Sequence, residues 1–155
     1  MPDLSNRMAQ LGLTLPEAPR PIASYIPAVG VSSGRLVFVS GQVPLESGKL
    51  IAAGTVPNEV SMEVAQRCAR QCVLNGLAAL AGEIGSLERL RRVVKLEVFV
   101  ACGPGFTEHP KVANGASDLL VELMGDDGRH ARAAVGVPSL PLGAPVEIAF
   151  TFLVD

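Results

Sequence analysis

Two segments of this chain have apolar residues at helical spacing, and this pattern constrains the fold more than any other feature. The first covers residues 59–81, where one face would carry Val64, Ala65, Cys68, Ala69, Cys72, Val73, Gly76, Leu77 and Leu80. The second covers residues 110–124, with a stripe of Val112, Ala113, Ala116, Leu119, Leu120 and Leu123. A helix that buries a single stripe needs another layer to lie on. We therefore expect both helices to lie on a sheet.

Short β-branched runs predict the strands of that sheet. They cover residues 29–31, 36–40 and 92–102, and the last segment, "HARAAVGVPSLPLGAPVEIAF" (130–150), adds two more runs around a Pro/Gly-rich loop. A short helix over residues 3–12 would precede them, capped by Asp3 or Ser5. The order predicts an α+β fold in one domain over residues 1–155, a mixed sheet with two helices on one face. Because the strands are apolar on both sides, we expect a partner subunit on the other face.

Composition excludes several classes of partner. Hydrophobic residues make up 48% of the 155 residues, charged residues only 18%, and the net charge is −2. Without a basic excess, we expect no nucleic-acid partner and no anionic membrane surface. No apolar run reaches the roughly 18 residues that a membrane span needs. The first residues lack the basic start and apolar core of a secretory signal, and the cysteine count is odd, so we expect a cytoplasmic protein.

The candidate metal ligands form weak patterns. Cys68 and Cys72 are four residues apart and would share one helix face, either as a metal pair or as two small buried side chains. Another set has no spacing that matches a known ligand pattern; it consists of Glu108, His109, Asp126 and Asp127. We therefore expect no metal and no other cofactor.

Charged residues inside the two last apolar runs are unexpected. Arg132 lies in the first run and Glu147 in the second, and charged side chains are almost never fully buried unless they are paired. They are either edge charges or parts of a polar site. In a plain hairpin with Val137 opposite Val146, Arg132 would face Thr151, about four residues from Glu147. Either the two strands are therefore not a plain hairpin, or the side chains converge in another way.

His130 adds a third polar group. It is two residues from Arg132, so in a strand both side chains point to one face. His130 is then either a second ligand contact that titrates near neutral pH or a surface histidine at the end of the strand.

Several segments resemble the RidA family, also called YjgF/YER057c/UK114 and "endoribonuclease L-PSP". The similarity covers residues 21–153, and its specific parts are "SGQVP" (40–44), "VVKLEVFV" (93–100) and "RAAVGVPSLPLGAPVEIAF" (132–150). The resemblance implies a chorismate-mutase-like subunit, a homotrimer, and ligand sites in clefts between subunits. It also implies hydrolysis of 2-aminoacrylate-type enamines and imines to 2-oxo acids and ammonia.

The resemblance also assigns roles to residues. Arg132 matches an arginine that binds the substrate carboxylate, for which a planar guanidinium is well suited. Glu147 matches a glutamate that orients or activates a water, as a carboxylate base can. Further positions match the ligand pocket of the family: Tyr25, Ser40, Gly41, Asn114 and Ala134.

The chain departs from the family in three places. Ala134 replaces a common cysteine, which excludes a thiol-dependent step there but keeps a backbone N–H. A pocket tyrosine on the second helix is replaced by Ser117 or lost. The segment between Val100 and Arg132 is also longer than in typical members, by about five residues relative to their sequences. These differences concern the substrate more than the chemistry.

Three functions are therefore compared. The first is an enzyme, a deaminase that hydrolyses small 2-enamine or 2-imine acids. The second is a trimeric protein that binds a small carboxylate without turnover. The third is a ribonuclease, which the acidic composition disfavours. We favour the enzyme because both Arg132 and Glu147 are present.

Overall fold

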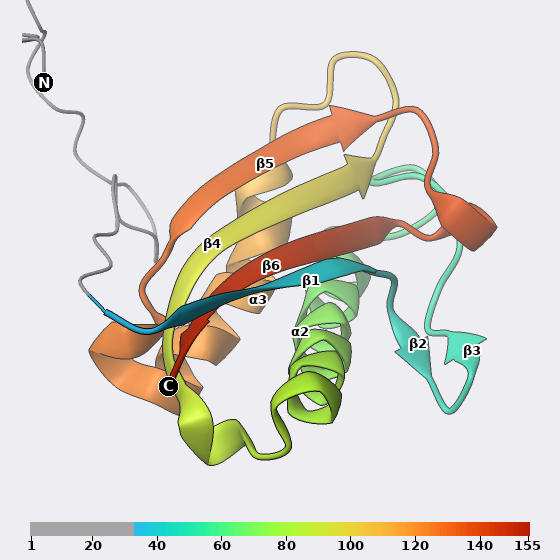
Figure 1. Ribbon diagram of the computed structural model, residues 1–155. Helices are drawn as coiled ribbons and strands as arrows, with labels where there is room; N and C mark the ends of the chain where they lie inside the picture. Colours follow the sequence, from blue (N-terminus) through green and yellow to red (C-terminus); the bar gives the residue numbers. More distant parts are fainter. Residues whose placement is uncertain (1–32) are drawn as a thin grey trace, which may run out of the picture.

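The computed structural model describes residues 33–155, which form a four-stranded mixed sheet with two helices behind it (Figure 1). The strands are β1 (Arg35–Gln42), β4 (Leu90–Ala101), β5 (Ala131–Val137) and β6 (Val146–Val154), and the short β2 (Leu45–Glu46) and β3 (Lys49–Leu50) pair separately. The helices are α2 (Met62–Ile84) and α3 (His109–Met124), with single turns at η1 (Leu87–Arg89), η2 (Gly125–Gly128) and η3 (Pro141–Gly143). The expected α+β architecture is confirmed. The elements expected at residues 3–12 and 29–31 lie outside the described residues.

The two last strands are not a hairpin. The order across the sheet is β1-β6-β4-β5, so β4 lies between β5 and β6. β6 is antiparallel to both of its neighbours, whereas β5 is parallel to β4 and is reached through α3. A parallel pair needs such a crossover connection, usually a helix. Of the two alternatives for Arg132 and Glu147, the structure therefore supports the first, that the strands form no plain hairpin.

Both helices agree with the sequence prediction except at their ends. α2 begins after Ser61, whose hydroxyl accepts a hydrogen bond of 3.3 Å from the Val64 N–H. It ends at Ile84, with Gly85 (φ 83°) as its C-cap, so the helix continues past Gly82 for two residues. For α3, Glu108 occupies the N-cap position without a side-chain hydrogen bond.

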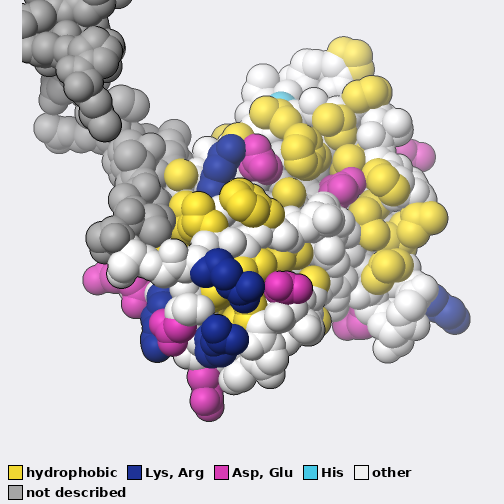
Figure 2. Space-filling view, viewed as in Figure 1, with side chains coloured by type: hydrophobic (Ala, Val, Ile, Leu, Met, Phe, Trp, Pro, Cys, Tyr) yellow, Lys and Arg dark blue, Asp and Glu magenta, His cyan; other side chains and the backbone are white. Residues whose placement is uncertain are grey.

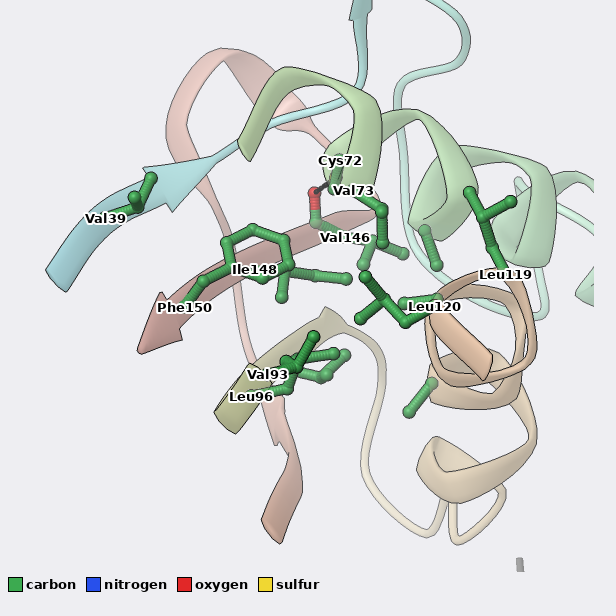
Figure 3. Packing of buried hydrophobic residues seen from close by; sticks show 14 of the residues in the cluster. Val39, Cys72, Val73, Val93, Leu96, Leu119, Leu120, Val146, Ile148 and Phe150 are labelled. Carbon is green, nitrogen blue, oxygen red and sulfur yellow. Dashed lines mark hydrogen bonds between the residues drawn. The ribbon is translucent and has the colours of Figure 1, made fainter. Parts of the chain in front are cut away.

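The core lies between the helices and one face of the sheet, where side chains of α2, α3, β4 and β6 meet (Figure 3). Cys68 and Cys72 are fully buried there, as the interpretation of small buried side chains predicts. Gly76 allows α2 to approach β6, since a Cβ atom at this position would lie 2.6 Å from the Phe150 ring. Leu123 differs from expectation: it is exposed rather than part of the buried stripe of α3.

The other face of the sheet is apolar and has no helix over it. Val37 and Val39 of β1 point to the helices, so Leu36 and Phe38 point to the open face, where Phe38 is 74% exposed. Val135 of β5 is a third large exposed side chain. Figure 2 shows hydrophobic side chains distributed over this side of the molecule. Among residues 33–155, no helix is both long and apolar enough to span a membrane.

Candidate active site

Arg132 lies on β5, and its guanidinium is held by α3. Its Nη1 donates hydrogen bonds of 3.0 Å to Asn114 Oδ1 and 3.0 Å to Ser117 Oγ. Asn114 and Ser117 are three residues apart on the helix and therefore project from neighbouring positions of one face. The half-buried Arg132 side chain is thus fixed in orientation by two neutral oxygens. A guanidinium oriented in this way is suited to bind a carboxylate.

A buried histidine, His130, holds Ser117 in position by a hydrogen bond. His130 has no exposed surface, its Nε2 lies 2.9 Å from Ser117 Oγ, and its Nδ1 lies 2.6 Å from the carbonyl oxygen of Gly128. A carbonyl can only accept, so Nδ1 must carry the proton and Nε2 must accept from the Ser117 hydroxyl. Ser117 Oγ in turn accepts from Arg132. The hydrogen bonds therefore run in one direction, from Arg132 through Ser117 and His130 to Gly128.

The pKa of His130 is consistent with this role. Its pKa is lowered to about 4, mainly by burial and to a lesser extent by the Arg132 charge, while the hydrogen bond to Gly128 acts in the opposite direction. The ring is therefore neutral at physiological pH. The expectation that His130 titrates near neutral pH is wrong, and so is the alternative of a surface histidine. The sequence could not show the burial, because it arises from packing under α3.

Ala134 follows Arg132 on the same face of β5. It pairs with Val98 of β4, while Arg132 pairs with Leu96. We call Asn114, Ser117, His130, Arg132 and Ala134 the arginine group. The sequence indicated Ser117 only as a residue that replaces the family's pocket tyrosine, if that tyrosine is not simply lost. Its spacing of three from Asn114 was the one signal that could have identified it as a partner of Arg132.

Glu147 of β6 lies in a second group, which it forms with the edge strand β1. β1 has an irregularity after Val39, where Ser40 and Gly41 together lie opposite the single residue Ala149 of β6. Such a bulge changes the direction of the chain and often lies beside active sites. Here it brings the Gly41 backbone against Glu147, since a Cβ atom on Gly41 would lie 1.8 Å from Glu147 Oε1. We call Ser40, Gly41 and Glu147 the glutamate group.

The two groups face opposite sides of the sheet. Arg132 pairs with Leu96, and Glu147 pairs with Phe99, three positions further along β4. Side chains alternate along a strand, so Arg132 points to the helices and Glu147 to the open face. At a strand spacing of about 4.8 Å and a rise of about 3.3 Å per residue, their Cα atoms are about 14 Å apart. Within one chain, these two side chains do not meet.

Two further expectations concern metals and Tyr25. Within residues 33–155, no group of three or more His, Cys, Asp or Glu side chains is placed to hold a metal ion. Tyr25 lies outside the described residues.

Comparisons with known proteins agree with the fold. The family model described as "YjgF/chorismate_mutase-like, putative endoribonuclease" matches residues 5–153. Protein TCP17 of Trypanosoma cruzi is 42% identical over 142 residues, which cover 91% of this chain and 88% of TCP17.

Two crystal structures are also similar over most of their length. Atu1372 of Agrobacterium tumefaciens, described as of unknown function, is 46% identical with a TM-score of 0.76 and covers 97% of this chain and 91% of its own. A protein of Shewanella oneidensis, described as a "putative endoribonuclease", is 31% identical with a TM-score of 0.74. The similarity covers 97% of this chain and 98% of the Shewanella protein. This chain belongs to the YjgF/chorismate-mutase-like family, which is also known as the RidA family.

Proposed function

We propose that this protein hydrolyses small reactive 2-enamine and 2-imine acids to 2-oxo acids and ammonia. The observation that carries the proposal is the oriented guanidinium of Arg132, held by Asn114 Oδ1 and Ser117 Oγ at 3.0 Å each. Family membership supports a role of this kind. A protein of the same fold, E. coli TdcF, which is 22% identical to this chain, has been crystallised with bound serine, a small carboxylate.

Arg132 would bind the substrate carboxylate. The backbone around Ala134 would form the adjacent wall of the pocket, and Asn114 would keep the guanidinium in place. The Arg132 side chain is half-buried between β5 and α3, so water would screen the ion pair less than it would at an exposed position. The contact is then a strong source of affinity for a 2-oxo or 2-imino acid.

Glu147 would act on the water. Its carboxylate would accept a proton as the water oxygen bonds to the imine carbon and would return that proton to the nitrogen, which gives a carbinolamine. The carboxylate would then take the hydroxyl proton as the C=O bond forms and pass it to the nitrogen as the C–N bond breaks, so imine and water give 2-oxo acid and ammonia. Ser40 and the exposed Gly41 backbone would form the wall beside this carboxylate, together with Tyr25.

A complete site then needs a second copy of the chain. The arginine and glutamate groups face opposite sides of one sheet, so the Glu147 that serves a given Arg132 would come from a neighbouring subunit. The open apolar face offers the surface for such contacts. We propose a homotrimer with sites between subunits, located in the cytoplasm. Light scattering should then give three times 16.1 kDa. Phe38→Asp, which puts a charge on the open face, should give monomers without activity.

A binding protein without turnover is the second candidate. One observation favours it: the arginine group is complete within one chain, whereas Glu147 depends on assembly. Ribonuclease activity is disfavoured, since the net charge is −2 and RNA binding relies on neutralising phosphates with basic side chains.

The deciding experiment measures 2-oxo acid and ammonia release from imino acids that an amino-acid oxidase generates in situ. A panel of amino acids supplies several imines at once. We expect release faster than spontaneous hydrolysis for small side chains, and no acceleration by Phe38→Asp. Binding of 2-oxo acids by calorimetry without any acceleration by the wild-type protein would support the binding protein instead.

A further inference from the structure

Away from both groups, Cys102 and His109 form a pair that the proposed function does not use. Cys102 follows the end of β4 and His109 is the first residue of α3, and the sulfur lies 3.4 Å from His109 Nε2. The backbone N–H of Cys102 donates a 3.0 Å hydrogen bond to the Val137 carbonyl, which fixes the cysteine beside the end of β5. The Phe106 ring contacts the His109 ring edge to face, with the centroids 4.9 Å apart. Both partners are therefore held in place by neighbouring elements.

The pair opens onto a surface pocket of about 370 Å³. Its lining is mostly apolar and consists of Cys102, Gly103, Pro104, Phe106, His109, Gly136, Val137 and Pro138. Within this described lining there is no Lys, Arg, Asp or Glu. The pocket is therefore suited to a small uncharged ligand rather than to a carboxylate or a phosphate.

The pair of Cys102 and His109 fits against β5 only because residue 136 is a glycine. A Cβ atom at this position would lie 2.5 Å from His109 Nε2 and 2.7 Å from the Cys102 sulfur. Any larger residue would therefore push the imidazole or the thiol out of place. β5 therefore has no side chain at Gly136, the position that lies against Cys102 and His109.

The other two cysteines show the contrast. Cys68 and Cys72 are fully buried in the core, and burial raises the pKa of both thiols. Cys72 also lies 3.9 Å from the Val146 carbonyl oxygen (Figure 3). Buried thiols of this kind are inert, whereas a half-exposed thiol beside an imidazole is placed to react.

We propose that Cys102 and His109 form a nucleophilic site that adds covalently to small uncharged α,β-unsaturated carbonyl compounds. His109 Nε2 takes the thiol proton, and the sulfur bonds to the β-carbon of the ligand. The π electrons of the C=C bond move onto the α-carbon and its carbonyl, and His109 returns the proton to the α-carbon. The thiol and the enone thus give one thioether, with no oxidant, reductant or leaving group. A thiolate paired with a base is the common form of an activated cysteine.

This site is distinct from that of Arg132. Gly136 and Arg132 lie four residues apart on β5, about 13 Å at the usual rise per residue. Addition at Cys102 and hydrolysis at Arg132 can therefore fail or succeed independently. Cys102→Ser should abolish addition and retain imine hydrolysis.

The test uses N-ethylmaleimide, a small uncharged Michael acceptor, on the full-length native protein at pH 7, followed by intact mass and peptide mapping. We expect one adduct per chain, at Cys102, formed at least tenfold faster than with N-acetylcysteine amide. With a maleimide that carries a carboxylate, Cys102 should react little faster than N-acetylcysteine amide does. The rate should saturate with reagent concentration, because binding in the pocket precedes the bond.

Variants then isolate the role of His109. His109→Ala and His109→Gln should each slow labelling about tenfold or more, and added imidazole should restore part of the rate in His109→Ala. Gly136→Ala should also slow it. In every variant Cys68 and Cys72 should stay unlabelled, which shows that the fold is intact. A wild-type rate no higher than that of the free thiol, or an unchanged rate in both folded His109 variants, would overturn the proposal.

Discussion

The arginine group and the glutamate group are built in different ways. Arg132 is held by side-chain hydrogen bonds to Asn114 and Ser117, and the latter is anchored by a histidine with no exposed surface. Glu147, by contrast, lies beside a bulge of the backbone at Ser40 and Gly41, on a face that no helix covers. One group is fixed by packing between a helix and a strand, and the other by the course of an edge strand.

The difference separates binding from catalysis. The arginine group needs no other chain to orient its cation, so binding affinity should depend on residues of α3 and β5. In the proposed trimer, the glutamate group acts only where a second chain presents an arginine group to it. Substitutions in the first should therefore change Kd or KM, and substitutions in the second should change kcat.

Glu147→Gln should have the largest effect, and only on turnover. Glutamine keeps the size of the side chain but cannot accept the proton of water, so kcat for imine hydrolysis should fall by about a hundredfold or more. Because glutamine keeps the size of the side chain, the Kd of a 2-oxo acid, measured by calorimetry, should stay within about twofold. This corresponds to a change in binding free energy well under about 1.4 kcal/mol. Glu97→Gln is the matched control on the same face, paired there with Lys95. Full turnover in Glu147→Gln would show that the base lies elsewhere.

Arg132→Ala should weaken binding instead. Truncating one partner of a poorly screened ion pair costs about 2–5 kcal/mol, so the Kd of a 2-oxo acid should rise about 30-fold or more. Arg132→Lys should recover little of this loss, because an ammonium cannot make the planar two-point contact. Arg129→Ala removes an equal charge at an exposed position and serves as the control. Unchanged affinity in Arg132→Ala would place the ligand site elsewhere.

His130 should make the stability of the protein depend on pH. Its folded-state pKa of about 4 lies below the ordinary 6.5, so the unfolded chain binds the proton first as the pH falls. The free energy of unfolding should therefore decrease below pH 6.5 and lose about 2 kcal/mol by pH 5, at about 1.4 kcal/mol per pH unit. His130→Gln should lack this component at equal protein concentration. If the free energy of unfolding, measured by denaturation, falls equally between pH 7 and pH 5 in wild type and in His130→Gln, the buried neutral ring is contradicted.

The architecture could be predicted well from the sequence because the patterns that indicate helices and strands are local. The periodicity of α2 and α3 and the β-branched runs of β4 and β6 depend on residues close in sequence, and both helices were placed within three residues. The arrangement of the site depends on contacts far apart in sequence. No local pattern shows that β4 separates Arg132 from Glu147, or that His130 is buried against Ser117. The family resemblance supplied the residues, but not the faces on which they lie.

Gly41→Ala should have a smaller effect on turnover than Glu147→Gln. The new Cβ atom would overlap Glu147 Oε1, so the carboxylate must move while remaining a base. A displacement of this kind should lower kcat about tenfold and leave the Kd of a 2-oxo acid nearly unchanged. Gly82→Ala is the control, because a Cβ atom there meets nothing within 4 Å and alanine favours the helix. A larger change in Kd than in kcat would contradict the division between the two groups.

Ser117→Ala should give the smallest effect, and it should fall on binding. The substitution removes one of the two oxygens that hold Arg132 and leaves His130 Nε2 without its donor, while Asn114 still orients the guanidinium. One lost hydrogen bond is worth about 1 kcal/mol, so KM and the Kd of a 2-oxo acid should rise about fivefold. The kcat should stay the same, which a general loss of structure would not allow. Asn114→Ala should act similarly, and the double variant should lose more than the sum of both, because each oxygen partly replaces the other. Exposed Ser139→Ala is the control. A lower kcat with an unchanged KM in Ser117→Ala would show that the hydroxyl acts on the reaction rather than on the orientation of Arg132.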